Sequence, residues 1–172
     1  MPESAQKIIE LLGLEPLEIE GGWYHEYWRS SFQITPGELG GEYPSARSLG
    51  SSIYYLLTSD NVSAMHRLPS DEIFHFYLGD PVEMLQLFPG GEGKIIRLGT
   101  DLAAGERPQV LAPGGVWQGC RLAGGKFGFA LMGTTVTPGF EFEDFTRGDY
   151  GELVSQYPQY SSLIKILTRH NH

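Results

Sequence analysis

Short apolar segments separated by glycine- and proline-rich turns dominate this chain from residue 23 to residue 145. About ten segments of strand length follow one another there, with turns every 8 to 12 residues or so. No helical pattern intervenes between them, which excludes a parallel α/β fold. The sequence therefore predicts an all-β sandwich or barrel. The expected strands are 23–30, 52–57, 63–67, 72–78, 82–88, 94–98, 109–111, 116–122, 127–136 and 140–145.

Short helices are expected at both ends of the chain. Ser4 can cap a helix over about residues 4–12, and Gly13 is a usual helix terminator. From Asp149 the pattern is helical again to about residue 168, with Pro158 inside it. No signal marks a second domain. We expect one domain over residues 1–172 with its core at about residues 20–146.

Charge and cysteine content narrow the class of protein. The chain carries 12 basic and 21 acidic residues, a formal net charge of -9, which repels phosphate backbones and anionic membranes. The amino terminus lacks a signal-peptide pattern, and no stretch approaches the ~18 apolar residues of a spanning helix. The single cysteine, Cys120, cannot form an internal disulfide. We expect a cytoplasmic protein with no nucleic-acid partner and no membrane association.

The stretch from His66 to Gly79, HRLPSDEIFHFYLG, is the strongest candidate for a functional site. His66 and Glu72 lie on two expected strands joined by a short turn, so we expect a hairpin to bring their side chains together. Strand alternation places Glu72, Phe74, Phe76 and Leu78 on one face and His75 on the other. Glu72 would thus enter an apolar interior, where a carboxylate is costly unless it is paired, hydrogen-bonded or bound to a cation.

This stretch resembles the first motif of the cupins, G(X)5HXH(X)3-4E(X)6G. His66, Glu72 and Gly79 match it, whereas Leu68 stands where the second histidine belongs. The segment from Pro113 to Gln118 is similar to the second motif, with Gln118 in place of the last metal-binding histidine.

Over about residues 5–167 the chain resembles the cupin 5 group of the cupin superfamily. The segments that carry the resemblance are GGWYHEYWRS, SSIYYLL, SDEIFHFYLGDPVEML, LAPGGVWQG and VTPGFEFEDF. The resemblance implies a double-stranded β-helix, or jelly-roll barrel, with a pocket at one end, and commonly a homodimer. Proteins of this fold include sugar-nucleotide epimerases, metal-dependent dioxygenases and non-catalytic binding proteins, so the fold does not choose the function.

The expected metal ligands are His66, Glu72 and Gln118. One imidazole, one carboxylate and one amide oxygen form a poor set for tight zinc or iron binding. We therefore expect no required cofactor and leave open a weakly bound divalent metal. The carboxy-terminal His170 and His172 form no metal motif.

Further residues are candidates for binding a ligand. Tyr24, Glu26 and Trp28 share one face of an early aromatic strand, and either this set or the opposite set of His25, Tyr27 and Arg29 could form a pocket wall. Aromatics with a few polar groups suit sugar or ring binding. Trp117 and Phe74 are candidates of the same kind, with core packing as the alternative. His75 is either a ligand contact or a structural histidine between sheets or at a dimer contact.

Two functional hypotheses follow. The first is an epimerase, isomerase or lyase that transfers a proton on a small polar, sugar-like ligand. In it His66 is the general base, Glu72 orients the base, Tyr24 returns the proton and Gln118 holds a substrate oxygen. The second is a non-catalytic small-ligand binding or sensing protein that uses the same residues. A metal-dependent oxygenase is a third, less favoured hypothesis.

Overall fold

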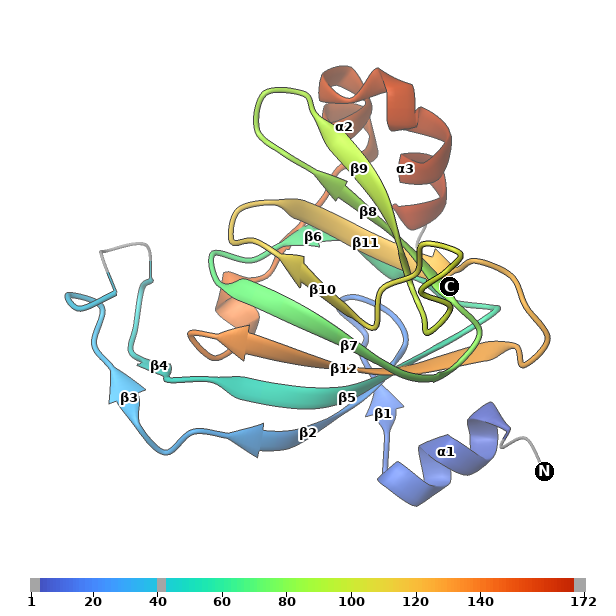
Figure 1. The fold of residues 1–172 in the computed structure, drawn as a ribbon. Helices are drawn as coiled ribbons and strands as arrows, with labels where there is room; N and C mark the ends of the chain where they lie inside the picture. The colour runs from blue at the N-terminus through green and yellow to red at the C-terminus, as the bar shows by residue number, and fades with distance from the viewer. Residues whose placement is uncertain (1–3, 40–42, 169–172) are drawn as a thin grey trace.

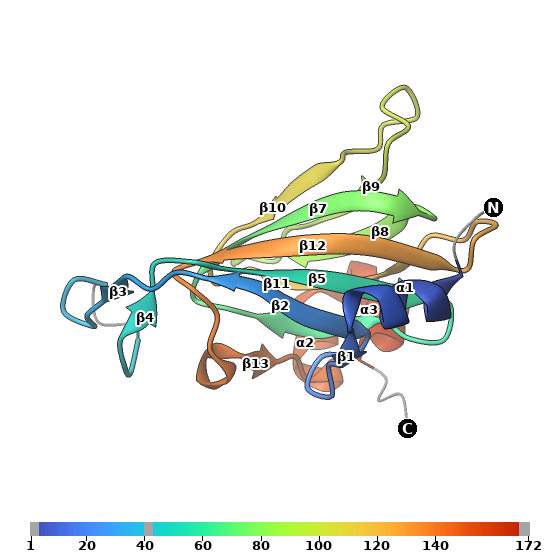
Figure 2. The same ribbon diagram turned by 90° about the horizontal axis from the view of Figure 1, so that it is seen from below.

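The computed structural model describes residues 4–39 and 43–168, so His170 and His172 lie outside it. Two antiparallel sheets face each other (Figures 1 and 2). The six-stranded sheet has the order β1-β2-β5-β12-β7-β10 and the five-stranded sheet the order β13-β6-β11-β8-β9. The strands are β1 Glu15–Pro16, β2 Trp23–Arg29, β5 Ser51–Thr58, β6 Ser63–Arg67, β7 Asp71–Gly79, β8 Val82–Leu87, β9 Gly93–Leu98, β10 Gln109–Ala112, β11 Trp117–Leu122, β12 Phe129–Thr137 and β13 Thr146–Arg147, and the ribbon β3 Gln33–Ile34 and β4 Arg47–Ser48 stands apart. The predicted all-β jelly roll is confirmed.

Three helical segments cover the outer faces. The helix expected near residues 4–12 is α1, Ala5–Leu12, capped by Ser4 and ended by Gly13 in the left-handed conformation. It packs on β5 and β12 through Ile8, Leu56 and Leu131. The expected carboxy-terminal segment comprises α2 Tyr150–Gln156, a 3-10 turn Pro158–Tyr160 and α3 Ser161–Leu167. Figure 1 shows α2 and α3 beside β8 and β9, on the far side of the barrel from α1. None of the helices within the described ranges is long and apolar enough to cross a membrane.

The space between the sheets has an apolar end and a polar end. Alternate residues of the facing strands fill the apolar end, and they include Tyr55, Phe74, Met84, Cys120 and Met132. Farther along the same strands, the inward positions carry polar side chains instead, and there the barrel is hollow. Close packing at the apolar end fixes the positions of the strands. The polar end can therefore keep a cavity between the same strands.

Three sequence-based expectations are wrong. His66 and Glu72 were expected on the two strands of one hairpin, but β6 and β7 belong to different sheets. Residues 140–145 were expected to form a strand, but Phe142–Asp144 form a 3-10 turn that crosses the polar end of the barrel. Leu78 was expected inside but is 41% exposed. The pairing of β7 with β12 shifts between Phe76 and Leu78, so a β-bulge at Tyr77 turns Leu78 outward.

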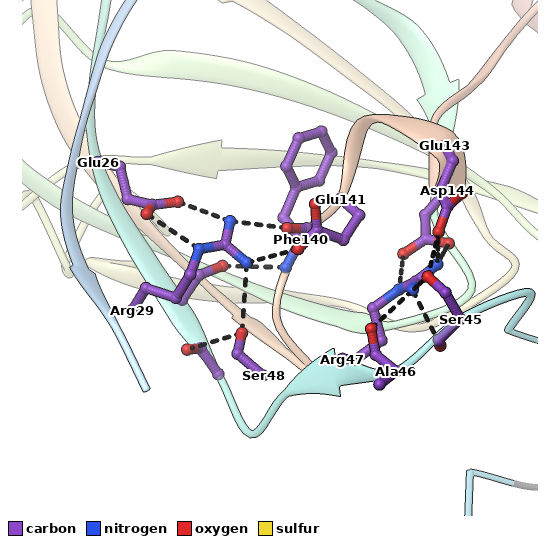
Figure 3. A network of polar contacts seen from close by, with 12 residues as sticks. Glu26, Arg29, Ser45, Ala46, Arg47, Ser48, Phe140, Glu141, Glu143 and Asp144 are labelled. Carbon is purple, nitrogen blue, oxygen red and sulfur yellow. Dashed lines mark hydrogen bonds and ion pairs between the residues drawn. The ribbon is translucent and has the colours of Figure 1, made fainter. Parts of the chain in front are cut away.

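A buried ion pair holds the crossing segment in place. The Arg47 guanidinium is fully buried and donates from Nε and Nη2 to the Asp144 carboxylate, both at 2.7 Å, as Figure 3 shows. This bonding raises the pKa of Arg47 above its usual range. The bonds between Asp144 and Arg47 hold residues 142–144 beside β4. The segment therefore forms a 3-10 turn instead of the strand that its local sequence predicts.

We expect Asp144→Asn to lower the free energy of unfolding by about 3 kcal/mol, because Arg47 would be left with a buried charge and only the half-exposed Glu143 as a counter-ion. Urea unfolding measures this change. Glu83→Gln is the matched control, since the Glu83–Arg121 pair is partly exposed and should be worth about 1 kcal/mol or less. Equal losses in the two variants would contradict the role given to Asp144.

Candidate functional site

The cavity at the polar end of the barrel has a volume of about 280 Å³. Both sheets and the crossing segment contribute to its wall. Its lining consists of Leu17, Glu20, Tyr24, Glu26, Arg29, Ser51, Ile53, His66, Leu68, Glu72, Thr134, Val136, Phe140, Glu141 and Phe142. Of the predicted site residues, His66, Glu72, Tyr24 and Glu26 are brought together here.

His66 lies on β6 with 1% of its surface exposed. Its Nδ1 is 2.8 Å from the carbonyl oxygen of Ala64, which can only accept a hydrogen bond, so the proton is assigned to Nδ1. The ring stacks on Phe145 with centroids 4.8 Å apart. Its Nε2 faces Glu20 Oε2 at 3.9 Å, beyond hydrogen-bond distance. The lone pair of Nε2 is thus available within the cavity wall.

Glu72 lies on β7 and is 6% exposed. Burial, and secondarily the nearby Glu20 carboxylate, raise the pKa of Glu72 to about 7, while His66, Thr134 and Gln118 act in the opposite direction. Gln118 Nε2 donates to Glu72 Oε2 at 2.7 Å. A carboxyl group with a pKa near 7 can both accept and release a proton at neutral pH.

Gln118 completes the cluster from β11. It lies directly opposite His66 in the pairing of β6 with β11 and reaches across the barrel to Glu72. Within residues 4–39 and 43–168, its buried Oε1 has no hydrogen-bond partner. The three residues predicted as one site are therefore neighbours, although they come from three strands.

Glu20 is a site residue that the sequence analysis missed. It belongs to the turn before β2, and its Oε1 accepts a short hydrogen bond from the Ser63 hydroxyl. The next residue, Gly21, has a φ of 106°, and a Cβ there would come 2.3 Å from the carbonyl oxygen of Val62. The Gly21-Gly22 pair was the available signal, because such a tight turn requires glycine. No local pattern shows that the turn directs Glu20 inward.

The cavity mouth is formed by β2 and the crossing segment. Tyr24 lies on the wall, and its pKa is raised by burial and then by a hydrogen bond with Glu15. Arg29 bridges Glu26, at 2.7 Å, and Glu141, at 2.9 Å. Arg29 was expected on the strand face opposite Tyr24 and Glu26, but the pairing of β2 with β5 shifts between Glu26 and Trp28 and brings Arg29 to the same cavity wall. Glu141 was missed, because it lies 112 residues from Arg29 in the sequence.

Other predicted ligand-binding residues lie away from the cavity wall. Trp117 lies on the face of β11 opposite to Gln118 and packs near α2 and α3. The guanidinium carbon of Arg67 lies over the Trp117 ring, 4.6 Å from its centroid. His75 lies on the outer face of β7 and is hydrogen-bonded with Thr135 and Gln109. Phe74 is buried in the apolar end of the barrel. Strand alternation explains the first two placements, since adjacent residues point to opposite faces.

The donor set does not fit a tight transition-metal centre. Leu68 lines the cavity at the position of the second cupin histidine, and the Gln118 amide donates a hydrogen bond to Glu72, one of the expected ligands. In the part of the chain that the structure describes, no group of three or more His, Cys, Asp or Glu side chains is arranged to hold a metal ion. We therefore derive no chemical step through a metal.

We expect the Glu72 carboxyl to titrate near pH 7 in carbon-13 NMR. Its pKa is raised on folding, so the associated stability is complete below its ordinary pKa of 4.5 and is lost as the pH rises through 7. Between pH 4.5 and pH 8 the wild type should lose about 3 kcal/mol of unfolding free energy relative to Glu72→Gln. Glu83→Gln is the control and should follow the wild type. A Glu72 titration near pH 4.5 would contradict this assignment.

Comparison with known proteins places the chain in a family. The family described as Cupin superfamily (DUF985) matches residues 6–147. The uncharacterized protein YML079W of Saccharomyces cerevisiae is 30% identical over 85% of this chain and 77% of its own length. The crystal structure of SO0799 from Shewanella oneidensis is similar, with 38% identity and a TM-score of 0.84 over 97% of this chain and 98% of that one. A hypothetical protein from Leishmania major has 28% identity and a TM-score of 0.84 over 96% of this chain and 98% of its own. The chain belongs to the cupin superfamily, in the family DUF985.

Proposed function

We propose that the cavity binds a small polar organic molecule and that the protein transfers a proton on it, as an epimerase, isomerase or lyase does. The observation that carries this proposal is the burial of His66 and Glu72 in one cavity wall, with the pKa of Glu72 raised to about 7. Strongly shifted groups in a cavity are typical of functional sites.

Each polar group has a role that its contacts support. His66 presents Nε2 as the general base, because Nδ1 is held by the carbonyl of Ala64. Glu72 accepts or releases a proton within the same wall. Tyr24, whose raised pKa keeps the phenol protonated, returns a proton to the ligand. Gln118 acts as a positioning residue through its hydrogen bond to Glu72, whereas the sequence had suggested that it holds a substrate oxygen.

A second candidate function is non-catalytic ligand binding or sensing. The observation that favours it is the presence of Leu68 in the cavity wall where many cupins place a histidine. In this account the same polar groups orient a ligand, and no bond in it changes. The two functions differ in whether a carbon-bound hydrogen of the ligand exchanges with solvent.

Proton NMR in deuterium oxide distinguishes the two functions. The protein is incubated with a panel of reducing amino sugars and amino ketones, in which a carbonyl group next to the carbon–hydrogen bond takes up the electron pair when the base removes the proton. We expect this hydrogen of a bound compound to be replaced by deuterium. His66→Asn keeps a donor at the Nδ1 position but lacks Nε2, so the exchange should slow by about 100-fold or more. Glu83→Gln should exchange at the wild-type rate.

Two results would contradict catalysis. Binding of a compound in the cavity without any exchange would favour the sensing function. Full exchange by a folded His66→Asn protein would show that His66 is not the base.

A further inference from the structure

The charges on the cavity wall are mostly negative. Four glutamates line it, namely Glu20, Glu26, Glu72 and Glu141. Among the described residues, Arg29 is the only lysine or arginine in the lining. An anionic ligand in the cavity would therefore need an ion pair with Arg29 to offset repulsion by the glutamates.

Arg29 has no hydrogen-bond donor left for such a ligand. Nε donates to Glu26, Nη2 to Glu26 and the carbonyl oxygen of Phe140, and Nη1 to Glu141 and Ser48 (Figure 3). These contacts use all five N–H groups of a guanidinium. Its charge is shared between two carboxylates, so this arginine links β2 to the crossing segment rather than offering an anion site.

The inner wall offers hydrogen-bond acceptors. The Nε2 of His66 carries a lone pair in its assigned tautomer, on a side chain that is almost fully buried. A carboxylate accepts about four hydrogen bonds, of which Ser63 uses one on Glu20 and Gln118 uses one on Glu72. The remaining acceptor positions, together with Nε2, can accept hydrogen bonds from a ligand.

From this arrangement we infer that the cavity takes a small organic cation with several N–H donors, such as an amidine, a guanidine or a primary amine, and rejects anions of the same shape. The inference rests on the proposed function and names the ligand class of that site. Apolar side chains between the polar groups, including Ile53, Leu68 and Val136, leave room for the carbon skeleton of the ligand.

Three probes of nearly equal shape test the charge preference: benzamidinium, benzamide and benzoate. Binding is measured at pH 8, where Glu72 is ionised, from changes in the nitrogen-15 chemical shifts of the His66 ring. The chain has 5 histidines, and the signal that disappears in His66→Asn is that of His66. We expect benzamidinium to bind about 10- to 100-fold more tightly than benzamide, because hydrogen bonds between charged groups are the stronger ones. Benzoate should not bind at millimolar concentration.

Two isosteric variants test which carboxylates are responsible. Glu20→Gln and Glu72→Gln should each lower the ratio of benzamidinium to benzamide affinity by about 10-fold. Glu83→Gln removes a carboxylate on the outer face of the five-stranded sheet, which pairs with Arg121, and should leave the ratio unchanged. The ratio is insensitive to a general loss of packing, since both probes share the same ring.

The outcomes separate this inference from the proposed function. Benzoate or benzamide binding at the His66 ring as tightly as benzamidinium would overturn the ligand class and leave the cavity as a ligand site. An unchanged ratio in both Glu20→Gln and Glu72→Gln would also overturn it. If none of the three probes shifts the His66 ring, the ligand class fails, whereas the proposed function fails only if the deuterium exchange is also absent.

Discussion

Burial of the Glu72 carboxylate between the two sheets, with the partly buried Glu20 carboxylate near it, is the constraint on which the site depends. A carboxylate in such a place is costly unless other groups compensate it, and here Ser63 and Gln118 supply hydrogen bonds. Compensation is incomplete for Glu72, whose pKa rises to about 7. The apolar end of the barrel supplies the packing that keeps these groups in position.

Two arginines join the cavity mouth to the rest of the barrel, and they do so in different environments (Figure 3). Arg47 forms a buried pair with Asp144, whereas Arg29 forms half-exposed pairs with Glu26 and Glu141. The buried pair fixes where residues 142–144 cross the barrel. The pairs of Arg29 occupy its donors, and the cavity therefore presents carboxylates, rather than a free guanidinium, to a ligand.

Membership of the cupin superfamily leaves the chemistry of this chain to its own residues. Leu68 and Gln118 replace two histidines of the cupin motifs, and each replacement has a structural consequence. Leu68 adds an apolar patch to the cavity wall, and Gln118 donates to Glu72. The result is a cavity wall that combines an apolar patch with a hydrogen-bonded carboxyl group whose pKa is raised to about 7.

The sequence by itself determined the fold class and most strand faces, because strand alternation and turn glycines act over a few residues. It marked His66 and Glu72 as candidates but expected one hairpin to join them, whereas they lie on strands of different sheets and line one cavity between those sheets. It also marked Gln118 through a motif. Only the tertiary structure decided that Glu20 and Arg29 belong to the site, that residues 142–144 cross its mouth and that Leu78 turns outward. These features depend on contacts between distant segments, such as Arg29 with Glu141 and the bulged pairing of β7 with β12, and no local pattern encodes them.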